Sequence, residues 1–356
     1  MAKVVASRTS GTRRRVLAVV AAVAVVAAAA VGAILLADDG DDERTEPPPT
    51  SEPVASILPL LGTPGRVPER AALAVKIDNT ERGRPPAGLT QADVVFEEMV
   101  EGGLTRLLAV YQSQDPDTVG PVRSARSSDL PILAELGRPL FAWSGANPTF
   151  AAAVRAADII DVGAAAAPDA YRRADDRRAP YNLFAAPERL REAGADDAAS
   201  ATPPPVLFSY RAADAPLSGA GLVPAAGFRT ISGGPISTGI EWSWNPGPAG
   251  WERSQDGTPH VDTDGERVSA VNVIIRFTPY GDSGVRDSTG AVVPEALAVG
   301  EGDAWLLSGG QAQQGRWLKP AADAPTTYTD AAGAPLRLAP GPTWVEVLPP
   351  GTGELF

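Results

Sequence analysis

The segment DVVFEEMVEGGLTRLLAVYQSQDPDTVGPVRSARSSD, residues 93–129, decides the fold of this chain. Two mainly apolar runs flank the pair Gly102-Gly103. Two glycines between alternating runs are typical of a two-residue β-hairpin loop, because glycine adopts the positive φ angles that such loops need. With these glycines as the loop, Met99 lies opposite Arg106. The segment therefore predicts a strand pair, followed by a loop and a helix.

This register places charged side chains on one face of the strand pair. Because side chains alternate along a strand, Glu97 and Glu101 share a face with Arg106. The opposite face is predicted to be core and contains Val94, Phe96, Glu98, Val100, Leu107, Ala109 and Tyr111. The charged group has two interpretations: an ion-pair cluster that fixes the register, or the lining of a ligand cleft.

The segment after the hairpin, residues 120–129, places Arg123 and Arg126 just before a predicted helix N-terminus. Guanidinium groups and the free N–H groups of a helix start both favour an anion. Ser124 lies between the two arginines, and Asp129 is available as a helix cap or as their internal partner. The predicted ligand-binding residues are Glu97, Glu101, Arg106, Arg123, Ser124, Arg126 and Asp129.

No catalytic residue is assigned. A nucleophilic serine needs a base, and the only histidine, His260, is far from Ser124, which also lacks a Gly-x-Ser-x-Gly motif. The sequence HVDTDGE, residues 260–266, indicates a polar turn, and no second cluster has metal-ligand spacing, so we expect no metal and no cofactor. Glu97 and Glu101 are the better carboxylate pair for acid/base chemistry.

The N-terminal part predicts a membrane anchor. Residues 1–15 form a basic tail, and residues 16–37 are 22 uncharged residues, long enough to span a bilayer as a helix. Arginines before this run and acids after it place the tail in the cytoplasm. The alternative is a cleaved signal peptide, because residues 31–33 form a small-residue site. Without cysteine, neither a lipidated N-terminal cysteine nor a disulfide can form.

The rest of the chain divides by composition. Residues 38–56 are acidic and proline-rich and predict a disordered linker. Strand and helix signals alternate in residues 57–205, whereas residues 206–356 carry short β-type runs separated by turn residues. We expect an α+β fold, with a mixed α/β N-terminal domain and a β-rich C-terminal domain, preceded by one transmembrane helix.

Charge limits the partners. The formal net charge is −12 and the exported part is acidic, which argues against nucleic acid, because that binding depends on cationic contacts to phosphate. We expect a monomer held at the membrane by its N-terminal helix, with a cell-wall or envelope ligand.

Several long motifs resemble one known family. They are GLTQADVVFEEMVEGGLTRLLAVYQS, GPVRSARSSD, RRAPYNLF, HVDTDGERVSAVNVII, GDAWLLSGGQAQQGRWLKP and PGPTWVEVLPPG. In these motifs the chain is similar to the YerB-like lipoproteins, named for their DUF3048 domain, over about residues 60–351. The resemblance implies an α/β-type region followed by a β-rich region at the bacterial envelope, and no established reaction. Members often carry a lipidated cysteine, absent here, and a histidine where Tyr181 stands.

These observations favour an exported, membrane-tethered binding or scaffold protein with a cleft lined by arginine and glutamate. The alternative is a hydrolase or transferase acting on a wall polymer, with Glu97 or Glu101 as the acid/base.

Overall fold

The computed structural model describes residues 56–199, 201–287 and 290–356, which form one compact unit. The predicted tail and anchor, residues 1–37, and nearly all of the predicted linker lie outside the described residues. Within the described ranges, no helix is long and apolar enough to cross a membrane.

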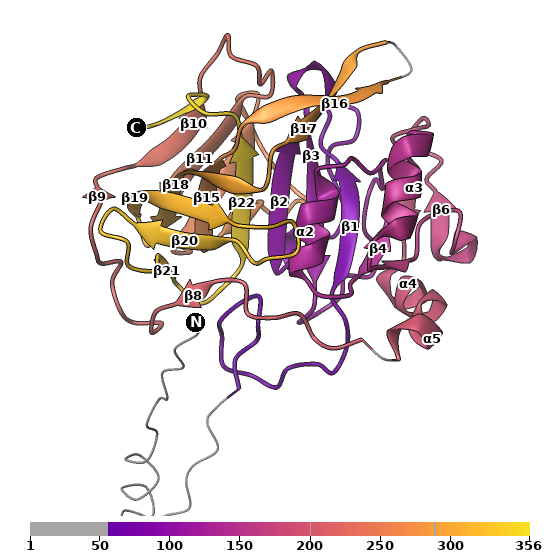
Figure 1. Cartoon of the computed structure of the whole chain (residues 1–356), viewed down its shortest axis with the longest axis horizontal. Coiled ribbons are helices and arrows are strands. Elements are labelled where there is room, and N and C mark those ends of the chain that lie inside the picture. The colour runs from indigo at the N-terminus through magenta and orange to yellow at the C-terminus, as the bar shows by residue number, and fades with distance from the viewer. Residues whose placement is uncertain (1–55, 200, 288–289) are drawn as a thin grey trace, which may run out of the picture. The chain divides into compact units, whose positions relative to one another are not determined.

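An eleven-stranded sheet runs across the molecule (Figure 1). Its strand order is β20-β19-β18-β15-β22-β2-β3-β1-β4-β5, with β9 paired to β19. The bounds are β1 Leu73–Asp78, β2 Val94–Met99, β3 Thr105–Tyr111, β4 Leu140–Ala142, β5 Ile160–Asp161, β9 Leu222–Val223, β15 Asn272–Phe277, β18 Gly300–Ser308, β19 Gln311–Lys319, β20 Thr327–Asp330 and β22 Thr343–Leu348.

Strands from both ends of the sequence meet at the centre of this sheet. β2 pairs in parallel with β22, and β22 pairs in parallel with β15. Residues on either side of position 205 therefore share one sheet, and all of the described residues belong to one compact unit. The division into 57–205 and 206–356 stays a prediction about sequence segments.

A second, six-stranded sheet is formed by the C-terminal half. Its strands are β10 Gly227–Thr230, β11 Ile240–Asn245, β12 Gly250–Gln255, β13 Thr258–Pro259, β14 Ser269–Ala270 and β23 Gly353–Leu355. Trp242 of this sheet packs edge-on against Trp344 of β22, with ring centroids 5.2 Å apart. Both belong to a buried cluster that also holds residues of β1 to β3, so this sheet covers one face of the large one.

The remaining strands form short two-stranded pairs. They are β6 Tyr171–Arg173 with β7 Leu183–Ala185, β8 Ser209–Tyr210 with β21 Arg337–Leu338, and β16 Tyr280–Arg286 with β17 Val292–Ala296.

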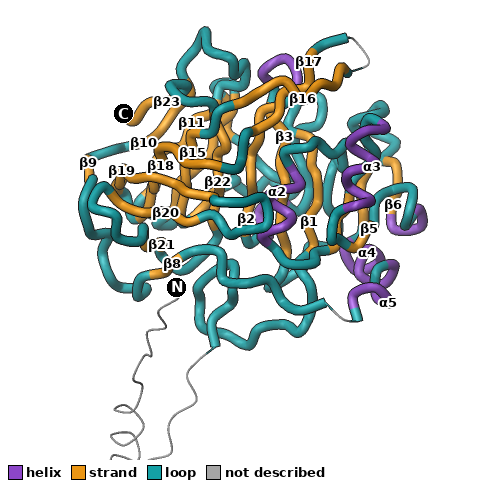
Figure 2. The backbone as a smooth tube through the Cα atoms, in the orientation of Figure 1, coloured by secondary structure: helices purple, strands orange, loops and turns teal. Residues whose placement is uncertain are grey.

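Within the described residues, the α-helices are few and come from residues 129–198 (Figure 2). They are α2 Asp129–Glu135, α3 Pro148–Ala156, α4 Pro187–Ala193 and α5 Ala195–Ala198, with short 3-10 turns at Leu89–Gln91, Glu101–Gly103 and Pro168–Ala170. Asn147 caps α3: its side chain accepts a hydrogen bond from the Thr149 amide. Few helices and many strands make this the expected α+β fold.

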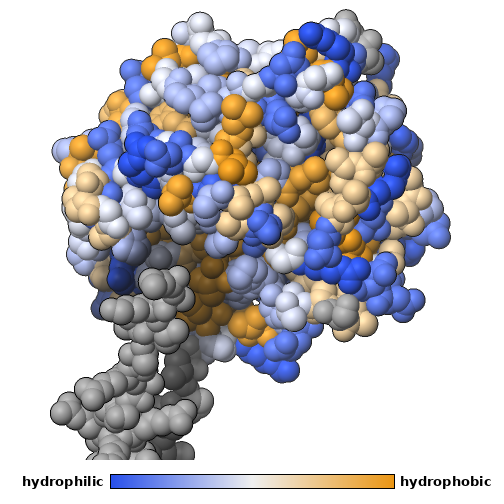
Figure 3. Space-filling view, viewed as in Figure 1, coloured by the Kyte–Doolittle hydropathy of each residue, from blue (hydrophilic) through white to orange (hydrophobic). Residues whose placement is uncertain are grey.

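α2 covers the other face of the large sheet. Ile132 and Leu133 of this helix are buried with Phe96 and Leu108 of β2 and β3. The outer surface of the molecule is mixed, since hydrophobic side chains lie in small groups between hydrophilic ones on the face in Figure 3. One face of β2 and β3 therefore packs with the second sheet, and the other face packs with α2. The charged residues of the candidate site are divided between these two faces.

Candidate functional site

The loop between β2 and β3 sets the register of the candidate site. It has three residues, Glu101–Gly103, and its two glycines have positive φ angles of 69° and 72°. Met99 therefore lies opposite Thr105, not opposite Arg106. The predicted register is wrong by one residue, because we expected a two-residue loop.

The shift separates the predicted charged cluster. Glu98 lies opposite Arg106, and Glu97 lies opposite Leu107. Since side chains alternate along a strand, Glu97 and Arg106 point to opposite faces of the sheet. The prediction that Glu97, Arg106 and Glu101 form one cluster on one face is wrong. Each face of the strand pair has its own group of charged residues.

On the face of Arg106, five of the predicted residues line one pocket of ≈ 640 Å³, which we call the arginine pocket. They are Glu101, Arg106, Arg123, Ser124 and Arg126. The remaining lining residues are Asn147, Phe150, Pro180, Arg286, Asp287 and Val293. The volume lies within the range of small-molecule sites.

Arg106 is the most buried cation of this pocket. Its side chain is 8% exposed, and its Nη1 donates to the Ser124 carbonyl oxygen at 3.2 Å. Its Nε is buried without a hydrogen-bond partner, and within the described residues no carboxylate forms an ion pair with it. Burial, and then the charges of Arg126 and Arg123, lower the pKa of Arg106 to about 10. The charges of Glu101 and Asp78 oppose this lowering only in part, and the guanidinium is charged at neutral pH.

The other two arginines of the pocket already have partners. Arg123 Nε lies 2.6 Å from Asp78 Oδ2, and its guanidinium stacks on the Tyr181 ring at 5.2 Å. Arg126 binds Glu101 with two hydrogen bonds of 2.7 and 2.9 Å. Burial alone would raise the pKa of Glu101, but the hydrogen bond and charge of Arg126 outweigh it and lower that pKa.

Asp129 lies behind the pocket and not in it. Its Oδ2 accepts from the Arg126 amide at 2.7 Å, and its Oδ1 lies 2.6 Å from Lys76 Nζ. Lys76 Nζ also lies 2.6 Å from Glu98 Oε2, and all three side chains are buried. Burial, together with the charge of Asp129, raises the pKa of Glu98 to about 8 against the opposing effect of Lys76. This network fixes the loop that carries the pocket arginines.

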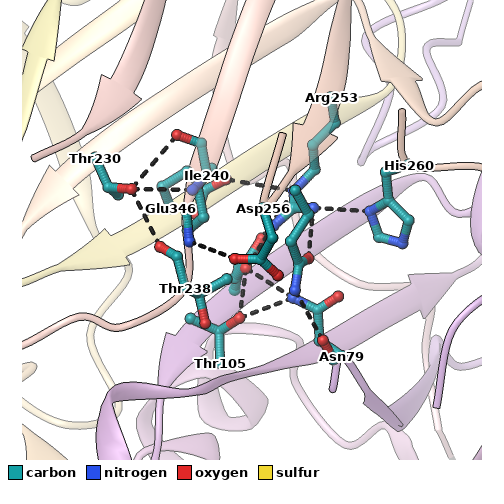
Figure 4. A network of polar contacts seen from close by, with 12 residues as sticks. Asn79, Thr105, Thr230, Thr238, Ile240, Arg253, Asp256, His260 and Glu346 are labelled. Atoms are coloured by element: carbon teal, nitrogen blue, oxygen red, sulfur yellow. Dashed lines mark hydrogen bonds and ion pairs between the residues drawn. The ribbon is translucent and has the colours of Figure 1, made fainter. Parts of the chain in front are cut away.

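On the opposite face, Glu97 binds Arg253 of β12. Arg253 lies in a polar network with Asn79, Thr105 and His260 (Figure 4). Arg253 Nη2 donates to Glu97 Oε1 at 2.7 Å, and its Nη1 contacts His260 Nδ1 at 2.8 Å. Asn79 and Thr105 also donate to Glu97, at 2.9 and 2.6 Å. Every member is buried. Glu97 thus does not line the arginine pocket.

Glu346 of β22 completes this network. Its Oε1 accepts from the Trp242 indole at 2.7 Å, and Arg253 Nε lies 4.0 Å away. Burial, and then the charge of Glu97, hold the pKa of Glu346 well above its ordinary value. Both carboxyl groups thus lie beside one arginine, Arg253. Burial, and then the charge of Arg253, hold the pKa of His260 well below its ordinary value, so this ring is neutral.

Sequence reasoning missed Arg253 and Glu346. The available signal was the one used for Glu97, a charge inside an apolar strand run, which TWVEVL at residues 343–348 also shows. Asp262, in the predicted polar turn, accepts from the Leu89 amide at 2.7 Å. No group of three or more potential metal ligands occurs among the described residues.

The fold and the pocket define an α+β protein whose main sheet is built from both halves of the chain. Two family descriptions match these halves: "Protein of unknown function (DUF3048) N-terminal domain" over residues 60–200, and "Protein of unknown function (DUF3048) C-terminal domain" over residues 234–345. The chain belongs to the DUF3048 family, as its motifs indicated.

Two comparisons with individual proteins agree. The chain is 26% identical over 309 residues to the putative lipoprotein YerB of Bacillus subtilis, which covers 84% of this chain and 88% of that protein. It is also similar to the crystal structure of YerB from Bacillus subtilis, with a TM-score of 0.70, 23% identity, and coverage of 85% of this chain and 99% of that chain. The structural likeness shows a shared fold.

Proposed function

We propose that this protein is a membrane-anchored, extracytoplasmic binding protein that holds an anionic ligand of the cell envelope in the arginine pocket. The observation that carries the proposal is Arg106, a buried guanidinium without an ion-pair partner among the described residues. A buried charge is costly unless it is paired. A bound anion would supply the partner that the protein itself does not.

The charge of the pocket supports an anion. Among the residues that line the pocket, the three arginines Arg106, Arg123 and Arg126 outnumber Glu101, and Asp78, which pairs with Arg123, lies outside the lining. Arg286 and Asp287 also line the pocket and carry opposite charges. The surplus is local, because the chain as a whole is acidic.

The extracytoplasmic location is supported by the sequence and by a relative. The similar protein from Bacillus subtilis is named a putative lipoprotein. This chain has no cysteine to carry a lipid, and its uncharged residues 16–37 have the length and the flanking charges of a transmembrane anchor. We therefore assign the anchoring role to that segment.

The alternative, a wall-polymer hydrolase or transferase, gains no support from the contacts of its two candidate acids. Glu97 is fully buried and bound to Arg253, away from the pocket. Glu101 lines the pocket, but its lowered pKa disfavours proton donation at neutral pH. No step of catalysis is assigned to either residue.

Binding of anions tests the proposed function. The full-length protein in detergent is titrated with small carboxylates and with inorganic phosphate, and binding is followed by calorimetry. We expect binding of at least one anion, with loss in Arg106→Gln. Arg229→Gln removes a half-exposed arginine paired with Glu354 and serves as the matched control. Failure of every anion to bind, or equal binding by Arg106→Gln, would contradict the proposal.

Location is tested separately. Intact cells are treated with protease after the wall is loosened, and the membrane fraction is probed for the protein. We expect the bulk of the chain to be cleaved and a short N-terminal piece to stay with the membrane. A full-length soluble form in the cytosol would exclude the anchor, and a released form that starts near residue 34 would favour a cleaved signal peptide.

A further inference from the structure

Arg123 presents two free nitrogen atoms to the arginine pocket. Its Nη1 and Nη2 donate no hydrogen bond within the described residues and, unlike its Nε, they are accessible to solvent. In Arg126, by contrast, Nε and Nη2 donate to Glu101, and Nη1 donates to a backbone carbonyl oxygen. Arg106 uses its Nη1 for a backbone carbonyl, and its Nε is buried. Of these three arginines, Arg123 is therefore the one whose guanidinium can give two donors to one ligand.

The backbone of Arg123 is fixed on both sides. Its amide donates to the Lys76 carbonyl oxygen of β1 at 2.8 Å, and its carbonyl oxygen accepts from the Ser144 amide at 2.9 Å. Ser144 follows β4, which pairs in parallel with β1. The start of the Arg123 side chain is thus attached to the large sheet. The groups that contact the guanidinium then decide which of its edges faces the pocket.

Asp78 holds the inner edge of this guanidinium. Its Oδ2 lies 2.6 Å from Arg123 Nε, and its side chain is fully buried at the end of β1. Its other oxygen, Oδ1, accepts from the Thr80 amide at 2.7 Å. Gly83 lies against the same carboxylate, since a Cβ at position 83 would be 2.7 Å from Asp78 Cγ. The carboxylate is therefore held in one place, and it fixes the Nε side of the guanidinium.

The ring of Tyr181 covers one face of the same guanidinium. The Cζ atom of Arg123 lies 5.2 Å from the ring centroid, and the arginine side chain is 16% exposed. A cation over the face of an aromatic ring is attracted to it, and more strongly where water is excluded. The chain around the ring is anchored, because Asn182 donates to two backbone carbonyl oxygens, and Pro180 lines the pocket. With Asp78 at the Nε side and the ring on one face, the edge formed by Nη1 and Nη2 is left for a ligand.

We infer that Tyr181 is a positioning residue of the arginine pocket, which together with Asp78 holds Arg123 so that Nη1 and Nη2 donate to two oxygen atoms of the bound anion. The inference rests on the proposed function, anion binding at this pocket, and it adds the residue that presents the donors. Tyr181 acts through Arg123. Carboxylates and phosphates both offer two such oxygen atoms to a guanidinium.

The first test uses the unaltered full-length protein in detergent. Phenylglyoxal attaches to the nitrogen atoms of an accessible guanidinium, and mass spectrometry locates the labelled arginines. With acetate or inorganic phosphate at about ten times its Kd, we expect labelling of Arg123 to slow at least about fivefold. Labelling of Arg229, which is paired with Glu354 and lies outside the pocket lining, should keep its rate. An anion that binds without slowing the labelling of Arg123 would overturn the inference.

Two substitutions separate the ring of Tyr181 from its hydroxyl. Tyr181→Leu removes the aromatic face, and we expect at least about fivefold weaker anion binding in calorimetry. Tyr181→Phe keeps the face and should restore the affinity. The matched control is Phe356→Leu, which removes a ring 5.2 Å from Arg229 Cζ, outside the pocket lining, and should leave the affinity unchanged. A purely structural role of Tyr181 predicts lower stability of Tyr181→Leu with unaltered anion affinity, and that result would overturn the inference.

A third substitution separates the two donors from the charge. Arg123→Lys keeps a cation beside Asp78 but replaces the planar group by a point charge, and we expect at least about tenfold weaker anion binding. Because the charge next to the buried carboxylate is kept, the variant should fold. Unchanged affinity in Arg123→Lys would overturn the role of Nη1 and Nη2.

The outcomes distinguish this inference from the proposed function. Anion binding that is lost in Arg106→Gln but unaffected in Tyr181→Leu overturns the positioning role and leaves the proposed function standing. Binding that is weakened in Tyr181→Leu and restored in Tyr181→Phe supports both. Absence of binding by acetate and by inorganic phosphate overturns both.

Discussion

Two buried arginines lie against opposite faces of the β2–β3 strand pair, and their surroundings differ. Arg253 is fully buried, binds Glu97 at 2.7 Å and contacts His260. Arg106 is 8% exposed and, among the described residues, donates only to a backbone carbonyl. One guanidinium is satisfied by side chains of the protein, and the other is not.

This difference in partners gives the two arginines different expected roles: Arg253 stabilises the fold, and Arg106 is the proposed binding residue. A buried ion pair whose members have hydrogen-bond partners loses much when one member is removed, because the other is left charged and buried. A buried cation without a partner has no such contact to lose. The Arg253 network therefore belongs to the structure that joins the two halves of the chain, whereas Arg106 is the residue to which we assign the proposed binding role.

Removal of Arg253 should give the largest effect. Arg253→Met leaves Glu97 beside Glu346 without a cation, and we expect a loss of about 3–5 kcal/mol in the free energy of unfolding. The measurement is urea unfolding at pH 7 of residues 57–356, which form one compact unit. Arg229→Gln, which breaks a half-exposed pair, should cost at most about 1 kcal/mol. Equal losses of unfolding free energy in Arg253→Met and Arg229→Gln would show that the Arg253 network stabilises the fold no more than an exposed ion pair does.

The loop that sets the register gives the next largest effect. Gly102 and Gly103 both have positive φ, so an alanine at either position is strained by about 1–2 kcal/mol. A Cβ on Gly102 meets nothing within 4 Å, whereas one on Gly103 would lie 2.5 Å from the Pro235 carbonyl oxygen. Gly103→Ala should therefore lower the unfolding free energy more than Gly102→Ala. The reverse order in urea unfolding would argue against the contact of this loop with residues 235–238.

A third prediction concerns a matched network on the face of Arg106. The pKa of Glu98 is raised to about 8, chiefly by burial. Between its ordinary value and pH 8 the folded state holds a proton that the unfolded state has lost. The contribution of Glu98 to stability is thus complete below about pH 4.5 and is lost as the pH rises towards 8.

Glu98→Gln removes this titration and keeps the shape of the side chain. We expect the fall in unfolding free energy between pH 5 and pH 8 to become less steep, by at most about 1.4 kcal/mol per pH unit. The wild type is the necessary reference, since Glu346 also has a raised pKa and contributes its own slope. An unchanged slope would mean that Glu98 is ionised beside Lys76 throughout this range.

Local sequence signals predicted the elements around the pocket. The alternation in residues 93–111 predicts the strand pair, and Asn147 followed by proline predicts the start of α3. The sequence also predicts that Arg106, Arg123 and Arg126 lie together, because the segments that carry them are close in the chain. The three side chains do line one pocket. Each of these features depends on neighbours within a few residues.

The features that sequence reasoning missed depend on long-range pairing. Whether the loop after Val100 holds two or three residues decides the face of Arg106, and two glycines fit either loop. The partner of Glu97 is Arg253, 156 positions away, and no local pattern connects them. Asp78, which binds Arg123, is brought close by the pairing of β1 with β3. The matched charges were therefore harder to predict than the unmatched one.

The smallest effect on stability is expected for Arg106. Arg106→Gln removes a cation that has no ion-pair partner among the described residues and that lies near Arg123 and Arg126. The lost hydrogen bond to the Ser124 carbonyl is offset by removal of a buried charge and its repulsion, so we expect no loss, or a small gain, in the free energy of urea unfolding. In the same variant anion binding should be lost. A loss of stability as large as that of Arg253→Met would show that Arg106 holds the fold together, and the contrast between the two arginines would disappear.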